Sequence, residues 1–164
     1  MNYFELFNIP VAFRVDNKQL TATYFELQKR YHPDRFAQAG ADEQEEALRM
    51  SALVNRAYKT LKDPDETIKY LLSLKGLLEE EEKYALPPDF LMEMMELNER
   101  MEEADPGQVQ AEIQQLKQDL YATVAAIVAN YQEGTGTEKE LLQVKDYYFR
   151  KKYLDRLAGQ GKMP

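Results

Sequence analysis

The chain has 164 residues, of which 44% are hydrophobic and 30% charged, and a formal net charge of −8 at pH 7. This composition is typical of a folded protein with one ordinary domain or two small ones, and it excludes a disordered chain. Cysteine is absent, which excludes disulfides and thiolate chemistry. No apolar run approaches the roughly 20 residues of a membrane span, and the start lacks a secretory signal pattern, so we expect a cytoplasmic protein.

The negative charge is confined to the second half of the chain. Residues 1–75 hold 11 Lys and Arg with 11 Asp and Glu, whereas residues 76–164 hold 10 Lys and Arg with 18 Asp and Glu. An acidic half repels nucleic-acid phosphates and anionic membranes. We therefore expect neither nucleic acid nor a membrane as a partner. The alternative, in which the acids form only a solvated surface, stays open.

The clearest element of the first half is a helix that ends in a stiff turn. Asp16 and Gln19 predict its start, as a capping-box-like pair. Its apolar residues recur at helical spacing as far as Tyr31. The helix must end there, because Pro33 fixes its own φ and pushes His32 out of helical space.

A second long helix is expected to pack antiparallel to the first. A loop over residues 32–41 leads into it, and it extends from about Asp42 to Asp63. Short helices, one before Pro10 and one ending at Gly76, cover this hairpin. The side chains expected to be buried are Leu20, Tyr24, Leu27 and Tyr31 in the first long helix, and Ala47, Met50, Val54, Ala57, Tyr58 and Leu61 in the second.

The second half predicts a linker followed by a helical bundle. Residues 76–87 combine a run of four glutamates with a stiff proline pair, which is typical of a linker. Three helices are expected to follow. The first covers residues 88–104, the second follows an apolar stripe that ends at Tyr131, and the third covers about 137–158. Because their connections are short, we expect them to form an antiparallel bundle. With no strand pattern, repeat or phosphate loop in the sequence, the predicted class is all-α in two parts. The stripe of the middle helix consists of Val109, Ile113, Leu116, Leu120, Ile127 and Tyr131.

The helix at 88–104 carries two apolar features. One stripe suffices to dock it into the bundle and consists of Phe90, Met94, Leu97, Met101 and Ala104. A second, outer face is apolar at one end and acidic at the other, and consists of Leu91, Met92, Met95, Glu96, Glu99 and Glu103. Such a patch indicates a binding site for a basic partner. In the alternative, its apolar residues pack under the first domain or the linker.

The single histidine, His32, does not predict chemistry of its own. It has no second ligand cluster nearby, so no metal site is expected, and no cofactor motif appears. We expect Pro33 to keep the side chains of His32 and Asp34 apart, and no serine or cysteine shows a nucleophile motif, so the chain is not expected to be an enzyme. In a further alternative, His32 merely caps a helix.

The arrangement of residues 1–75 resembles a J domain. A short helix, a basic helix ending in His32-Pro33-Asp34, a loop and an antiparallel helix carry the resemblance. It implies that this tripeptide, with Lys29, Arg30 and Arg35, docks on a DnaK-class chaperone and stimulates its ATP hydrolysis.

Four further segments narrow the resemblance to HscB-type co-chaperones of iron–sulfur cluster biogenesis. They are residues 3–7 (YFELF), 70–74 (YLLSL), 90–93 (FLME) and 153–157 (YLDRL). The resemblance implies that the J domain recruits the chaperone HscA and that the bundle, residues 88–164, binds the cluster scaffold IscU. The implied scaffold contacts are Leu91, Met92, Met95, Glu96, Glu99, Glu103 and Tyr153. Two alternatives are a J-domain adaptor for a different client and a helical interaction module without chaperone activity.

Overall fold

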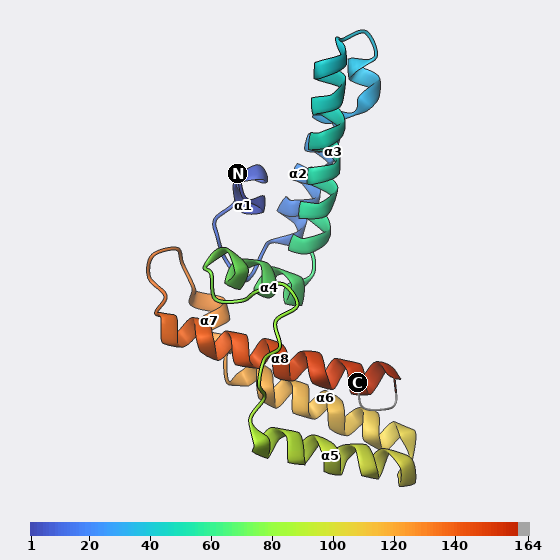
Figure 1. Cartoon of the computed structure of the whole chain (residues 1–164), viewed down its shortest axis with the longest axis vertical. Coiled ribbons are helices and arrows are strands. Elements are labelled where there is room, and N and C mark those ends of the chain that lie inside the picture. The colour runs from blue at the N-terminus through green and yellow to red at the C-terminus, as the bar shows by residue number, and fades with distance from the viewer. Residues whose placement is uncertain (161–164) are drawn as a thin grey trace. The chain divides into compact units, whose positions relative to one another are not determined.

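The computed structural model describes residues 1–160, and all regular secondary structure in that range is helical (Figure 1). This confirms the predicted all-α class. Contacts divide the chain into two compact units. Within the described range, unit 1 comprises residues 1–71 with 132–134, and unit 2 comprises residues 72–131 with 135–160. No helix of the described range has the length and apolarity needed to cross a bilayer.

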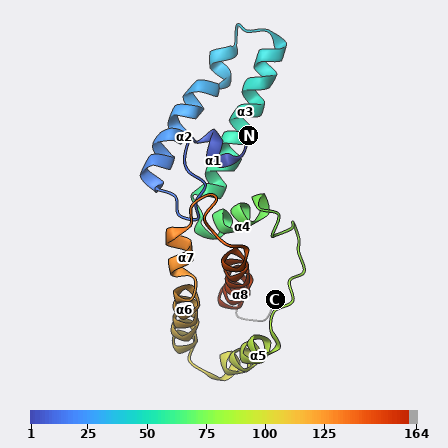
Figure 2. The ribbon, with the colours of Figure 1, turned by 90° about the vertical axis from the view of Figure 1, so that its left-hand side faces the viewer.

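Unit 1 is built on two antiparallel helices that pack along their length (Figure 2). The predicted buried residues of the first are confirmed for Leu20 and Leu27, whereas Tyr24 is half-buried. Its hydroxyl donates a hydrogen bond to Asn55 Oδ1 at 2.8 Å, which keeps the ring at the rim of the core. The elements of this unit are α1 (Tyr3–Leu6), α2 (Asn17–Tyr31), the 3₁₀ turn η1 (Pro33–Phe36), α3 (Ala41–Leu61) and the first part of α4 (Pro64–Leu74).

The ends of α2 follow local sequence chemistry. Asp16 Oδ1 accepts the backbone N–H groups of Lys18 at 3.0 Å and Gln19 at 3.4 Å, which confirms the predicted N-cap. The helix ends at Tyr31, as predicted. The loop predicted over 32–41 is wrong in one part, because η1 interrupts it. Proline is favoured in the first turn of a helix, and this signal could have predicted η1.

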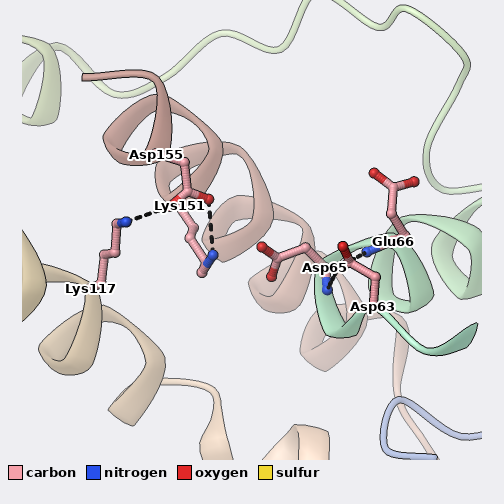
Figure 3. Close-up of polar contacts among 6 residues, drawn as sticks. All are labelled: Asp63, Asp65, Glu66, Lys117, Lys151 and Asp155. Carbon is pink, nitrogen blue, oxygen red and sulfur yellow. Dashed lines mark hydrogen bonds and ion pairs between the residues drawn. The ribbon is translucent and has the colours of Figure 1, made fainter. Parts of the chain in front are cut away.

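The start of α4 is fixed by another side-chain cap. Asp63 Oδ1 accepts the backbone N–H groups of Asp65 at 2.9 Å and Glu66 at 3.2 Å (Figure 3). Pro64 occupies the first helical position, where a backbone N–H would have no partner within the helix, so the lack of one in proline costs no hydrogen bond. The helix then extends to Leu74, and Gly76 follows with φ +73°, a left-handed conformation that suits glycine after a helix end.

Unit 2 is a bundle whose middle member differs from the prediction. The prediction of a single helix along the stripe that ends at Tyr131 is wrong, because the helix is interrupted between Ala122 and Ala125. No proline or glycine marks the break. Instead, the Thr123 hydroxyl donates to the Leu120 carbonyl at 2.7 Å and closes the last turn. The helices are α5 (Pro88–Glu103), α6 (Pro106–Ala122), α7 (Ala125–Asn130) and α8 (Glu138–Gln160).

The core of the bundle lies between α5, α6 and α8. Its buried residues are Phe90, Met94, Leu97, Val109, Ile113, Leu154 and Leu157. The inner stripe predicted for α5 is therefore confirmed for its first three members, and Met101 and Ala104 pack partly buried against the same cluster. In α7 and the break before it, Val124 and Val128 are buried, whereas the predicted Ile127 and Tyr131 are only half-buried.

An ionic cluster joins α6 to α8 beside this core (Figure 3). Asp155 accepts hydrogen bonds from Lys117 at 2.6 Å and from Lys151 at 2.9 Å. Burial raises the pKa of the Asp155 carboxyl, but the hydrogen bonds from the two lysines outweigh burial, and the net pKa lies below its usual value. The carboxylate therefore stays charged and cross-links the two helices.

A segment ahead of α5, which we call the strap (residues 82–84), packs along α8. Glu82 pairs with Lys145 at 2.7 Å, and the Tyr84 hydroxyl donates to Asp146 at 2.8 Å. The Tyr84 ring stacks on Phe149, with centroids 4.6 Å apart. Burial, together with the hydrogen bond to the Asp146 carboxylate, raises the pKa of Tyr84 to about 12. Part of the segment predicted as a linker is thus held against the bundle.

Candidate functional site

The first candidate surface is the turn at the C-terminal end of α2. His32 is extended (φ −60°, ψ 132°) and separates α2 from η1. Its Nδ1 atom accepts the backbone N–H of Asp34 at 3.2 Å, and its carbonyl accepts the N–H of Arg35 at 3.0 Å. The side chain and the backbone of one residue therefore both fix the turn. The helix-capping role considered for His32 is present, as the N-cap of η1.

The side chains of His32 and Asp34 do approach each other. Nδ1 and Oδ2 lie 3.7 Å apart, so the prediction that Pro33 keeps them apart is wrong. The tight turn of η1 folds residue 34 back toward residue 32. An imidazole whose Nδ1 atom accepts the backbone N–H of Asp34 carries no proton on that atom. The hydrogen bond from the Asp34 N–H and an ion pair between Nδ1 and the Asp34 carboxylate therefore exclude each other. The Asp34 side chain is 93% exposed, so a partner molecule can reach its charge.

The cations around this turn play two different parts. Lys29 and Arg30 are exposed in the last turn of α2, and within residues 1–160 neither side chain makes a hydrogen bond or an ion pair. Arg35 instead turns back, and its Nη1 atom donates to the Lys29 carbonyl at 3.2 Å. It thereby satisfies a carbonyl that the end of α2 leaves open. The six residues predicted to bind a chaperone thus form one continuous surface, and Arg35 also stabilises it through its hydrogen bond to the Lys29 carbonyl.

The second candidate surface is the outer face of α5. Leu91, Met92 and Met95 are 36%, 62% and 54% exposed. The acidic residues Glu96, Glu99 and Glu103 continue this face toward the end of the helix and are also exposed. At 100° per residue these six positions fall within about 140°, centred opposite the buried stripe. The structure therefore brings six of the seven predicted scaffold contacts onto one face.

The seventh, Tyr153, is placed differently. It lies on α8, half-buried, and its ring meets the Phe90 ring edge-on with centroids 6.0 Å apart. Burial raises the pKa of its hydroxyl. Phe90 belongs to the inner face of α5, so the Tyr153 ring contacts the inner face of this helix. Its helical spacing along α8 did not indicate this, because the contact depends on how α5 and α8 pack.

Both surfaces have the chemistry of protein docking. The turn presents a carboxylate and cations on a fixed backbone, and the outer face of α5 presents apolar side chains beside acids. Within residues 1–160, no group of three or more His, Asp or Glu side chains could hold a metal ion.

Comparisons with known proteins agree with this description. The family model described as "HSCB C-terminal oligomerisation domain" matches residues 86–160. A Vibrio cholerae protein named co-chaperone protein HscB homolog is 46% identical over 111 residues, which cover 65% of each chain. The match thus spans slightly less than two thirds of that relative's length. Such relatives are named co-chaperones, not enzymes.

Solved structures extend the likeness over nearly the whole chain. The chaperone HscB from Vibrio cholerae is 33% identical, with a TM-score of 0.76, over 98% of this chain and 94% of that one. Human co-chaperone protein HscB is 28% identical, with a TM-score of 0.81, over 98% of this chain and 80% of that one. An identity above 30% along nearly the full length, on the same two-part helical fold, means that the chain belongs to the HscB family of co-chaperones.

Proposed function

We propose that the chain is an adaptor that stimulates the ATPase of a DnaK-class chaperone of the HscA type and delivers to it an iron–sulfur cluster scaffold of the IscU type. Family membership supports the co-chaperone role. The observation that carries the proposal is the exposed His32-Pro33-Asp34 turn beside the cationic end of α2. ATP hydrolysis then occurs in the chaperone, so the adaptor itself needs no catalytic residue.

The turn has the properties that a docking element needs. Pro33 fixes the backbone, and the His32 imidazole holds η1 through the Asp34 N–H, so the Asp34 carboxylate meets a partner in one orientation. Lys29 and Arg30 add exposed positive charge within the same turn of helix, which speeds the approach of an acidic partner surface. Little conformational entropy is lost on docking, because the backbone is already ordered.

The outer face of α5 has the properties of a scaffold-binding surface. Met92 and Met95 are exposed, adaptable apolar groups, and the glutamates that follow favour a basic rim on the partner. Tyr153 supports this helix from the inner side through Phe90. We propose the same seven residues as the scaffold site.

Joining the two surfaces in one chain raises the effective concentration of scaffold at the chaperone. The cytoplasm is the compartment that we propose for this encounter.

The test is chaperone ATP turnover, measured with the purified full chain, with and without scaffold. We expect the wild type to stimulate turnover and His32→Gln to stimulate it at least tenfold less, because glutamine cannot reproduce the imidazole cap of η1. Gln38→Ala, at an exposed position just beyond the turn, serves as the matched control and should behave as the wild type. A wild type that stimulates no turnover would end the co-chaperone proposal.

Two alternatives remain distinguishable. An adaptor for a different client would stimulate the ATPase, but Leu91→Ala and Met92→Ala would leave scaffold binding unchanged. A helical interaction module without chaperone activity would show no difference in turnover between the wild type and His32→Gln.

A further inference from the structure

The outer face of α5 carries two thioethers that the proposed function uses only as apolar groups. Met92 and Met95 are each more than half exposed, whereas Met94 on the inner face is 1% exposed. Met92 and Met95 lie three residues apart and are therefore neighbours on the helix surface. With Leu91 they form the apolar end of the outer face, so two of its three apolar side chains contain an accessible sulfur atom.

An accessible thioether reacts with hydrogen peroxide. The peroxide transfers one oxygen atom to the sulfur, which loses two electrons and becomes a sulfoxide, while the peroxide itself is reduced to water and no proton is left over. The sulfoxide turns a flexible apolar side chain into a polar one that accepts hydrogen bonds. The reaction requires access to the sulfur, which Met92 and Met95 provide and the buried Met94 does not.

The acids beside the two methionines favour a neutral oxidant. Glu96 and Glu99 are exposed on the same face, and Glu93 is exposed next to Met92 in the sequence. Their negative charge repels anionic oxidants, whereas hydrogen peroxide is neutral at pH 7 and approaches freely. The turn proposed to dock on the chaperone differs in this respect, because residues 29–35 contain neither methionine nor cysteine. Peroxide therefore acts on one of the two proposed surfaces and not on the other.

We propose that Met92 and Met95 form a redox-sensitive modification site, at which peroxide makes the scaffold-binding face polar and weakens scaffold binding. This inference rests on the proposed function and adds regulation to it. In the free chain, water solvates a sulfoxide at either position. Scaffold binding would remove that water and bury the sulfoxide against apolar groups, which costs binding free energy. Reduction by methionine sulfoxide reductases returns the thioether, so the modification is reversible.

The test oxidises the purified full chain with hydrogen peroxide and removes the peroxide with catalase before any scaffold is added. Peptide mass spectrometry should then show one added oxygen at Met92 and at Met95, and none at Met94. The Kd for an IscU-type scaffold should rise about tenfold, because two polar groups enter the interface. Stimulation of the chaperone ATPase without scaffold should not change, and treatment with methionine sulfoxide reductases should restore scaffold binding.

The matched control is a double variant, Met92→Leu with Met95→Leu, which nearly conserves side-chain volume and has no thioether at either position. Each protein is compared with its own oxidised form, so any effect of leucine itself on binding cancels. Peroxide should not change the Kd of the double variant. Met1 is 84% exposed and belongs to neither proposed surface, so its oxidation in both proteins confirms that the peroxide has acted. Circular dichroism of each oxidised protein checks that the helices stay folded.

The outcomes separate the inference from the proposed function. An unchanged Kd after oxidation of Met92 and Met95 would overturn the redox-sensitive site and leave the scaffold site intact. Equal losses of binding in the wild type and the double variant would assign the effect to another residue, and a loss of helical signal would assign it to unfolding. Either result would also overturn the inference. An unoxidised wild type that binds no scaffold would instead remove the scaffold proposal, and the redox-sensitive site with it.

Discussion

The turn after α2 and the outer face of α5 are both exposed, but for different physical reasons. The turn owes its shape to its own residues, since Pro33 and the His32 cap fix it within a few positions. The face of α5 is exposed only because the opposite side of the helix, with Met94 and Leu97, is buried in the bundle. A turn fixed by its own residues should keep its shape when a core is damaged, whereas an exposed helix face depends on the core beneath it.

The largest effect should separate the two faces of α5. Met94 is 1% exposed and Met92 is 62% exposed on the same helix. Met94→Ala should lower the free energy of unfolding of unit 2 by about 2–5 kcal/mol, because it leaves a cavity, whereas Met92→Ala should change it by less than about 0.5 kcal/mol. Denaturant titration measures both. Equal losses for the two substitutions would contradict the assignment of inner and outer faces.

The second test concerns the turn alone. Pro33→Ala removes the restraint that keeps His32 extended, so the turn can adopt helical geometry and the Asp34 carboxylate loses its fixed direction. We expect ATPase stimulation to fall about tenfold, equivalent to about 1.4 kcal/mol, while the free energy of unfolding changes by less than about 0.5 kcal/mol. If stimulation survives, the turn does not need its proline, and the local origin of the docking element is wrong.

A smaller effect should link the bundle to its outer face. Asp155→Asn leaves Lys117 and Lys151 without their shared carboxylate and should destabilise unit 2 by about 1 kcal/mol, since more than a third of the Asp155 side chain is exposed and water screens the pair. Scaffold binding should weaken slightly, and ATPase stimulation without scaffold should not change. An unaltered denaturation midpoint at pH 7 would refute the cross-link.

The pH dependence of this variant has a defined sign. The pKa of Asp155 is lowered in the folded state, so its stabilisation is present above its ordinary value of 3.8 and is lost as the pH falls below it. The stability difference between the wild type and Asp155→Asn should therefore be constant near neutral pH and shrink below pH 3.8. A difference that grows on acidification would reverse the assigned sign.

The features predictable from the sequence are those set by neighbouring residues. Asp16 starts α2 and Pro33 ends it, because a cap and a fixed φ act over one turn. The two faces of α5 also follow from spacing alone, since a 3.6-residue period separates Met92 from Met94.

The features missed depend on tertiary packing or on turn detail. The break before α7 has no proline or glycine to announce it, and the bundle buries Val124 in place of the stripe residue Ile127. The approach of His32 to Asp34 depends on η1, which the proline at its first position could have predicted in place of a loop. Tyr153 reaches Phe90 only because α5 and α8 share a core.

The strap also determines where the chain can be divided. A C-terminal fragment that begins at Pro88, the start of the bundle by helix pattern, would lose Glu82 and Tyr84. Lys145 would then lose its ion-pair partner and Phe149 its stacked ring. A fragment that begins at or before Glu82 would retain both of these contacts with α8.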